Sequence, residues 1–262
     1  MLPLEKNVTS VELLGKRGSF FKEEDRIYAL LPIPLGAPPG SHKVYLFQNE
    51  KAVESIFVNI EKKSYALQSL TIRKRRKVEP NRDDLRRIKS ESGRKKMARS
   101  FRRDGFANVD FIWPVEGELS SPFGLRRVLN GKPRAPHRGI DIAAPAGVPV
   151  AAAADGVVVD AGDFFFSGNL VFIEHREGVV TTYAHLDKIA VRPGERVEKG
   201  DLVGYVGSTG RVTGPHLHFG VMVDSVYVDP LLFLPTRHPS SAAAEKLSKI
   251  SHGPAGRNPY HK

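Results

Sequence analysis

Short apolar segments separated by turn-forming residues run through this chain and restrict it to a fold built mainly from β-strands. In the C-terminal half they lie at residues 148–150, 156–159, 170–173 and 179–183. Glycine and proline supply the breaks, with 24 and 19 residues among 262. Helical periodicity is nearly absent there, so we predict a glycine-rich β domain over residues 111–235.

The first 80 residues repeat this pattern on a smaller scale and predict an accessory β domain. Apolar runs at residues 27–31, 44–47, 56–60 and 70–72 are separated by turn signals. Short strands at this spacing are typical of an immunoglobulin-like sandwich. The segment holds no candidate chemistry, so we expect a binding, spacer or regulatory role for residues 1–80.

Residues 81–110 carry a helical pattern rich in basic side chains and predict a linker between the two β domains. Asn81 can cap the helix, and Asp83 and Asp84 suit its first turn, where the helix dipole favours negative charge. Gly93 lies within the pattern, so the sequence allows a break into two pieces there. Residues 236–262 are rich in serine, alanine, lysine and glycine and predict a C-terminal tail with a short helix.

The chain contains no cysteine, which excludes disulfides, thiolate nucleophiles and thiolate metal ligands. A metal site must therefore use histidine, aspartate or glutamate. The formal net charge of +11 favours polyanionic partners, which include nucleic acid, anionic lipid and acidic cell-wall polymers. The basic run at residues 73–77 would suit nucleic acid, but no RNA-binding aromatic motif or zinc finger accompanies it, so we expect no nucleic-acid partner.

The sequence shows no segment able to span a membrane. No apolar run reaches 18 residues, and the N-terminus lacks the apolar core of a signal peptide. Two locations stay open on this ground alone: the cytoplasm, or the cell envelope with the export signal removed from this chain.

The strongest chemical signal is a pair of histidines, His216 and His218, that follows a glycine-punctuated turn. Apolar and aromatic residues come next, so the pair is interpreted as part of a strand. Alternate side chains of a strand share a face, which would bring the two Cα atoms within about 7 Å of each other. One imidazole could bind a metal while the other transfers protons, although a strand-end histidine is often only a hydrogen-bonded polar residue.

Two more segments can complete such a site. His137 and Asp141 are four residues apart in a stretch whose prolines and glycine argue against a helix. A straight strand would separate them by about 13 Å, so we expect the chain to bend at Gly139. In the second segment, strand alternation predicts that Tyr183 and His185 share a face, with Tyr183 used for packing. Two histidines and one aspartate would give an open zinc site and leave a further pair of histidines for proton transfer.

These segments, together with residues 123–131, resemble the LytM-domain, lysostaphin-type zinc metallopeptidases, which cleave peptide cross-links in bacterial peptidoglycan. The similarity covers residues 113–232, and its three separated motifs occur in the order and spacing of the family. It implies a C-terminal antiparallel-β catalytic domain of the duplicated-hybrid-like type. The N-terminal β domain and the basic linker resemble the accessory region of exported Gram-negative members.

The resemblance also implies a role for each of five residues. His137, Asp141 and His218 would bind one zinc ion. His185 and His216 would be catalytic, because they would orient or deprotonate the attacking water, stabilise the oxyanion and protonate the leaving amine.

The function expected from this resemblance is that of a zinc metallopeptidase, a DD-endopeptidase that acts on peptidoglycan stem peptides in the periplasm or cell envelope. The D-alanyl–diaminopimelate cross-link is the expected bond, and a regulatory partner in the envelope is a further expectation. Two alternatives are a catalytically silent regulator of cell-wall amidases and a basic nucleic-acid-binding protein. The presence of all five site residues favours catalysis, and His175, outside the motifs, is interpreted as structural.

Overall fold

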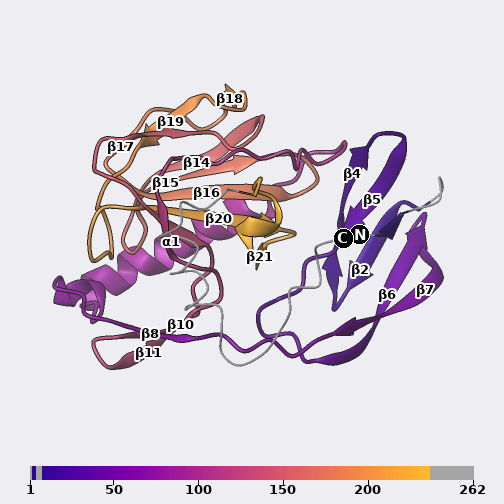
Figure 1. Cartoon of the computed structure of the whole chain (residues 1–262), viewed down its shortest axis with the longest axis horizontal. Helices are drawn as coiled ribbons and strands as arrows, with labels where there is room; N and C mark the ends of the chain where they lie inside the picture. Colours follow the sequence, from indigo (N-terminus) through magenta and orange to yellow (C-terminus); the bar gives the residue numbers. More distant parts are fainter. Residues whose placement is uncertain (1, 4–7, 237–262) are drawn as a thin grey trace.

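The computed structural model describes residues 2–3 and 8–236, which form five β-sheets and one long helix (Figure 1). The N-terminal strands lie at the right of Figure 1, and the largest sheet lies at the left. This architecture confirms the prediction of a mainly β chain. The predicted tail helix falls beyond residue 236 and so lies outside the described residues.

The N-terminal region contains two small antiparallel sheets, with strand orders β1-β5-β4 and β3-β2-β6-β7. The strands are β1 (Leu2–Pro3), β2 (Ser10–Leu13), β3 (Lys16–Arg17), β4 (Ser19–Glu23), β5 (Arg26–Leu30), β6 (Gly40–Gln48) and β7 (Lys51–Ile60). Alternate residues of β2 are buried, so Val11 and Leu13 pack with Ala29, Val44 and Leu46 in a small core. The immunoglobulin-like assignment of this region stays a prediction.

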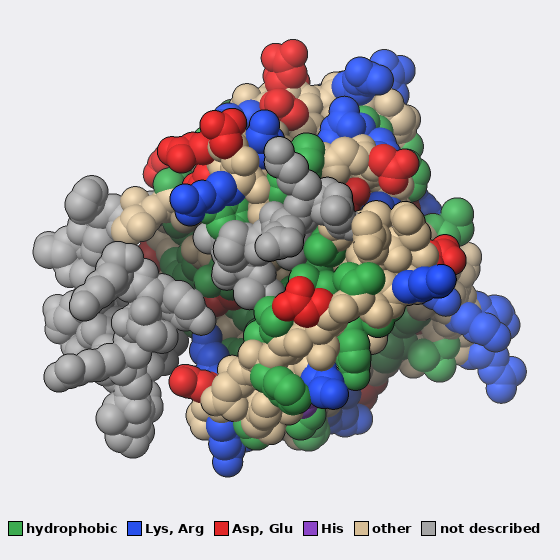
Figure 2. Space-filling view, turned by 90° about the vertical axis from the view of Figure 1, so that its right-hand side faces the viewer, with side chains coloured by type: hydrophobic (Ala, Val, Ile, Leu, Met, Phe, Trp, Pro, Cys, Tyr) green, Lys and Arg blue, Asp and Glu red, His purple; other side chains and the backbone are tan. Residues whose placement is uncertain are grey.

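The outer face of these two sheets is a mixed surface. Figure 2 shows Lys and Arg side chains dispersed there among acidic and hydrophobic ones. The long strands β6 and β7 contribute exposed hydrophobic side chains, among them Tyr45, Val53 and Phe57. The positive charge of the chain is therefore not gathered into one continuous basic surface on this face.

The helix α1 (Arg82–Ser100) begins at the predicted cap. Asn81 accepts a hydrogen bond from the backbone of Asp84, whose carboxylate accepts one from the backbone of Asn81 in return. The helix continues through Gly93 without the break that the sequence allowed, because side chains on both sides of Gly93 bind the strand β14 (Gly156–Phe164). These contacts are Arg87–Asp163 at 2.7 Å and Arg94–Asp160 at 2.6 Å. Within the described residues, no helix is both long enough and apolar enough to cross a bilayer.

The largest sheet has eight strands and positions most of the site. Its order is β18-β14-β15-β16-β20-β12-β9, with β21 paired to β20. The strands are β9 (Glu118–Ser121), β12 (Ile140–Ala143), β14 (Gly156–Phe164), β15 (Gly168–Glu174), β16 (Val179–Leu186), β18 (Arg196–Val197), β20 (Leu217–Val223) and β21 (Val226–Val228). The main core packs against one face of this sheet and includes Ile140, Tyr183 and Phe219, all fully buried.

Two three-stranded sheets complete the fold, with orders β11-β10-β8 and β13-β19-β17. Their strands are β8 (Leu67–Leu70), β10 (Arg126–Leu129), β11 (Lys132–Arg134), β13 (Pro149–Ala151), β17 (Lys188–Ile189) and β19 (Leu202–Tyr205), and two short 3-10 helices lie at Arg75–Lys77 and Pro230–Leu232. β8 pairs in parallel with β10, so a strand from the first 80 residues hydrogen-bonds to the C-terminal part. The domain boundaries at residues 80, 110 and 235 stay predictions.

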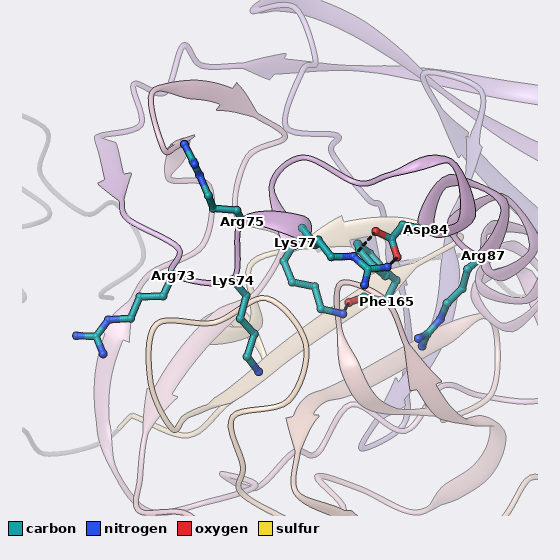
Figure 3. Close-up of a pocket in the computed structure, with 8 residues that line it drawn as sticks. Arg73, Lys74, Arg75, Lys77, Asp84, Arg87 and Phe165 are labelled. Carbon is teal, nitrogen blue, oxygen red and sulfur yellow. Dashed lines mark hydrogen bonds and ion pairs between the residues drawn. The ribbon is translucent and has the colours of Figure 1, made fainter.

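The basic run at residues 73–77 lies beside α1 and Phe165, where it lines a cavity of about 560 Å³ (Figure 3). Arg76 pairs with Asp84 at 2.8 Å, and Lys77 donates a hydrogen bond to the carbonyl of Phe165 at 2.6 Å. Arg73 extends away from Phe165 in Figure 3 and is exposed. Part of this run therefore attaches the linker to the C-terminal part of the chain.

Candidate metal centre

Two neighbouring strands of the largest sheet place the first pair of candidate ligands. In the antiparallel pair β12 and β20, Asp141 lies directly opposite His218. Their neighbours Ile142 and Leu217 are buried in the main core, so strand alternation turns Asp141 and His218 toward the other face. His218 Nδ1 lies 2.7 Å from Asp141 Oδ1.

His137 joins this pair because the chain bends just before β12. The bend falls at Gly139, as predicted, but the backbone there is not left-handed. A Cβ atom at position 139 would lie 2.4 Å from the carbonyl oxygen of Phe219 and 2.9 Å from the ring of His218. Glycine is therefore required by the close approach of β20 and not by its own conformation.

Three ligand atoms meet at this point of the sheet. His137 Nε2 lies 2.9 Å from Asp141 Oδ1 and 3.0 Å from His218 Nδ1. All three residues together form a group of atoms able to hold a metal ion. Zinc accepts two ring nitrogens and a carboxylate oxygen, and its bonds of about 2.0–2.2 Å place such donors roughly 3–3.5 Å apart. The residues present thus fit one zinc ion after a small outward movement of the donors.

Hydrogen bonds from neighbouring segments orient these side chains. His137 Nδ1 donates to the carbonyl of Pro122 at 2.8 Å, so the lone pair of Nε2 faces the cluster. The outer carboxylate oxygen of Asp141 accepts a hydrogen bond from Arg127 at 2.8 Å, and Arg127 donates to Gln68 at 3.1 Å. Because Gln68 lies in β8, a strand from the N-terminal region helps to orient a candidate metal ligand.

The electrostatics of the cluster favour an ionised carboxylate at Asp141 and lower the pKa of two of the neighbouring histidines, His218 and His185. Burial raises the pKa of Asp141, but the charges and hydrogen bonds of His137 and His218 outweigh burial and hold that pKa well below its ordinary value. Burial lowers the pKa of His218 to about 4, against the opposing effect of Asp141. Burial, assisted by His216 and His218, also places the pKa of His185 well below its usual range.

Two further histidines, His185 and His216, border the cluster. His185 Nδ1 donates to the carbonyl of Thr209, and His216 Nδ1 donates to the carbonyl of Gly214, each at 2.9 Å. In the neutral form of both rings, Nε2 therefore carries a free lone pair. His216 Nε2 lies 3.8 Å from Asp141 Oδ1. The ring centres of His185 and His216 are 4.9 Å apart.

The position of His185 departs from strand alternation. Tyr183 packs in the main core, and Ala184, which lies opposite His218, faces the cavity of the metal centre. Regular alternation would turn His185 back toward the core, on the same side as Tyr183. The φ of His185 is 66°, a left-handed conformation that brings its side chain to the cavity as well. The prediction that Tyr183 and His185 share a face is therefore wrong.

His175 lies away from this cluster in a closed hydrogen-bond network. Its Nδ1 donates to the carbonyl of Asp155 at 2.8 Å, and its Nε2 bonds the hydroxyl of Thr181 at 2.8 Å. The hydroxyls of Thr181 and Tyr183 share a hydrogen bond of 3.1 Å, and Tyr183 accepts another from the backbone of Ala153. His175 is fully buried and has no ring nitrogen left for a ligand.

All five predicted site residues line one cavity of about 490 Å³. Gln68, Arg127 and Arg211 line it too, and sequence reasoning did not single them out as site residues. Arg127 lies inside the segment that carries the family resemblance, which is the one signal that points to it. Gln68 reaches the site through the pairing of β8 with β10, and no local pattern predicts that pairing.

The antiparallel sheet with a two-histidine, one-aspartate cluster defines a β protein with a candidate metal site open to a groove. The model of peptidase family M23 matches residues 135–230, a stretch that contains all five residues of the site. A solved structure from Pseudomonas aeruginosa, described as a peptidase M23, is 33% identical with a TM-score of 0.71 and covers 88% of both chains. The chain belongs to peptidase family M23.

Curated relatives match a smaller part of the chain. The peptidoglycan DD-endopeptidase ShyC of Vibrio cholerae is 45% identical over 114 residues, which are 43% of this chain and 26% of the relative. The DD-carboxypeptidase/endopeptidase Mpg of Neisseria meningitidis is 45% identical over 135 residues, 51% of this chain and 31% of the relative. The chain thus spans about a quarter to a third of the length of these relatives.

Proposed function

We propose that this chain is a zinc endopeptidase that hydrolyses peptide cross-links of peptidoglycan, with the D-alanyl–diaminopimelate bond as its target. The observation that carries the proposal is the convergence of His137, Asp141 and His218, whose three ligand atoms lie 2.7–3.0 Å apart. Membership of peptidase family M23 and the names of the relatives ShyC and Mpg support the substrate class.

In this proposal His137, Asp141 and His218 hold one zinc ion. When bound, the ion supplies a Lewis acid that polarises the scissile carbonyl and acidifies the attacking water. Arg127 and Pro122 keep the ligands oriented, through Asp141 and His137 respectively.

His185 and His216 transfer protons in this proposal. Their Nδ1–H groups are held by backbone carbonyls, so each presents a basic Nε2 when neutral. A neutral imidazole there accepts a proton from the attacking water and delivers it to the leaving amine. The lowered pKa of His185, caused chiefly by burial, keeps that ring neutral at physiological pH.

The location follows from the substrate. Peptidoglycan lies outside the cytoplasmic membrane, so the proposal places the chain in the periplasm or cell envelope. The N-terminal region contributes Gln68, Leu70 and Ile72 to one wall of the groove. A regulatory envelope partner that displaces this wall would alter access to the metal centre, and its existence is part of the proposal.

Digestion of purified cross-linked muropeptide dimers, with products identified by mass, tests the function. The proposal expects monomeric muropeptides from the wild-type protein and none from Asp141→Ala. A protein that carries zinc but leaves every dimer intact would contradict the endopeptidase proposal and favour the regulator of amidases. A protein that holds no zinc at neutral pH would contradict both the metal site and the activity.

A further inference from the structure

The groove beside the candidate metal centre contains an arginine, Arg211, that forms no ion pair with any other described residue. Of the charged side chains that line it, three are arginines, Arg127, Arg138 and Arg211, and one is the carboxylate of Asp141. That carboxylate is already engaged by Arg127 and the histidines. Within the described residues, the half-buried guanidinium of Arg211 has no ion pair and no hydrogen bond. Charges held out of water are usually paired, so this donor group points to a ligand.

Contacts with Phe166 and the turn at Gly210 position Arg211 in the groove. Its backbone N–H donates to the carbonyl of Phe166 at 2.9 Å, and its guanidinium carbon lies 4.5 Å from the centre of the Phe166 ring. The preceding Gly210 has a φ of 78°, and a Cβ atom there would lie 2.4 Å from the backbone nitrogen of Gly168. A guanidinium stacked on an aromatic face keeps its edge donors free for a planar anion.

Neighbouring cations make this point of the groove electropositive. Burial lowers the pKa of Arg211 to about 10, and the charges of Arg134 and Arg127 add to that effect. Burial likewise lowers the pKa of Lys95, on α1, to about 8, with Arg211 among the cations that contribute. A bound anion would relieve the repulsion among these groups.

We propose that Arg211 binds a carboxylate of the cross-linked peptide and so determines which peptides the metal centre can cut. A guanidinium matches a carboxylate with two parallel hydrogen bonds, whereas a carboxamide offers only one acceptor oxygen. Diaminopimelate is a dicarboxylic amino acid, so stem peptides bring such groups to the groove. This assignment rests on the proposed function and deepens it by naming the recognised group.

The test is a comparison of kcat/KM on two matched peptide dimers. One dimer keeps its carboxyl groups free, and in the other all of them are converted to primary carboxamides. The wild-type protein should cut the free-acid dimer roughly 10- to 100-fold more efficiently, since a charge-assisted bidentate pair is lost on amidation. In Arg211→Gln this preference should fall to about 3-fold or less, with zinc content unchanged.

Two further variants separate recognition from general effects. Arg211→Lys keeps the charge but loses the planar fork, so its preference should lie between those of the wild type and Arg211→Gln. Arg86→Gln removes an equal charge from the exposed side of α1 and should match the wild type on both dimers. If Arg211→Gln does not fold, the role of Arg211 is still tested by the preference for the free-acid dimer in the wild type and in Arg211→Lys.

The possible results separate carboxylate recognition by Arg211 from the proposed endopeptidase activity. Equal wild-type rates on the two dimers, or equal loss on both in Arg211→Gln, would overturn the role of Arg211 and leave the endopeptidase intact. Failure of the zinc-loaded wild type to cut either dimer would overturn the proposed function, and the role of Arg211 with it.

Discussion

The two ends of strand β16 bring buried histidines into opposite environments. At one end, the hydroxyl of Thr181 bonds Nε2 of His175 and the carbonyl of Asp155 accepts from its Nδ1, so both ring nitrogens are hydrogen-bonded inside the protein. At the other end, His185 is held through Nδ1 alone and borders the groove. Burial lowers the pKa of both rings, that of His175 to about 4 and that of His185 well below its ordinary value.

The difference shows that a lowered pKa does not by itself mark a chemical role. Both rings are neutral at pH 7, so both could in principle act as bases. Only His185 keeps an Nε2 free for an external proton, and only His185 lies next to His216 and the ligand cluster. His185 therefore differs from His175 in its access to the groove and in its free hydrogen-bond position, more than in its basicity.

The largest effect should come from removal of a candidate ligand. Asp141→Ala takes away the one carboxylate that binds both His137 and His218, so zinc affinity and hydrolysis should each fall by roughly 1000-fold or more. Metal analysis after dialysis and muropeptide digestion measure the two losses. The matched control His175→Gln changes a histidine that bonds Thr181, toward the other end of β16, and should keep its zinc. Equal zinc in both variants would contradict the assignment of Asp141.

Replacement of the bordering histidines should separate proton transfer from metal binding. His185→Ala and His216→Ala should each keep about one zinc per chain, while kcat falls by roughly 10²- to 10⁴-fold because a general acid–base group is lost. Zinc content and kcat on a muropeptide dimer are measured on the same preparation. Loss of zinc from either variant would show that ligand and catalytic roles have been exchanged.

The burial of His175 should make the stability of the protein depend on pH. The pKa of His175 is lowered from 6.5 to about 4, chiefly by burial, with a contribution from Arg103, so between these values the unfolded chain binds a proton that the folded chain does not. Stability therefore rises with pH in this window: the contribution of His175 is complete above pH 6.5 and is lost as the pH falls through 4. The shift corresponds to about 3 kcal/mol.

Urea denaturation of the wild type and His175→Gln, between pH 7 and 4, measures this contribution. The variant has no titrating group at position 175, so its unfolding free energy should fall less on acidification. Other groups titrate alike in both proteins, and the difference isolates His175. Parallel curves for the two proteins would contradict the depressed pKa.

The smallest expected effect concerns the support of Asp141 by the N-terminal region. Gln68→Leu removes the acceptor that holds Arg127, so zinc affinity should weaken by up to about 10-fold without loss of the site. Competition with a zinc chelator measures the affinity. Gln48→Leu, at the exposed end of β6, is the matched control. An affinity equal to that of the wild type in Gln68→Leu would mean that Arg127 does not need its partner.

Much of the candidate site could be predicted from the sequence because its ligands lie in short segments with strong local signals. Two histidines before an apolar run indicated the strand β20, and the glycine between His137 and Asp141 indicated the bend. That Asp141 and His218 meet could not be derived from spacing. The family resemblance implied that both bind one zinc ion, and the structure adds that they lie opposite each other on β12 and β20. The structure places those ligand atoms within 3.0 Å of one another.

Other features depend on contacts that no local pattern encodes. Strand alternation failed at His185 because one left-handed residue reverses the face of its own side chain. Gly93 did not break α1, because ion pairs to β14 hold the helix on both sides of it. Gln68 reaches the groove because β8 pairs with β10, and Arg211 does so because its turn packs against Phe166. The sequence does not reveal either contact.

Zinc analysis combined with X-ray absorption on the wild-type protein would decide whether His137, Asp141 and His218 hold one zinc ion. We expect about one zinc per chain at neutral pH, with two nitrogen donors and one oxygen donor from the protein at about 2.0–2.2 Å. A protein free of zinc under these conditions, or a bound zinc without histidine ligands, would contradict it.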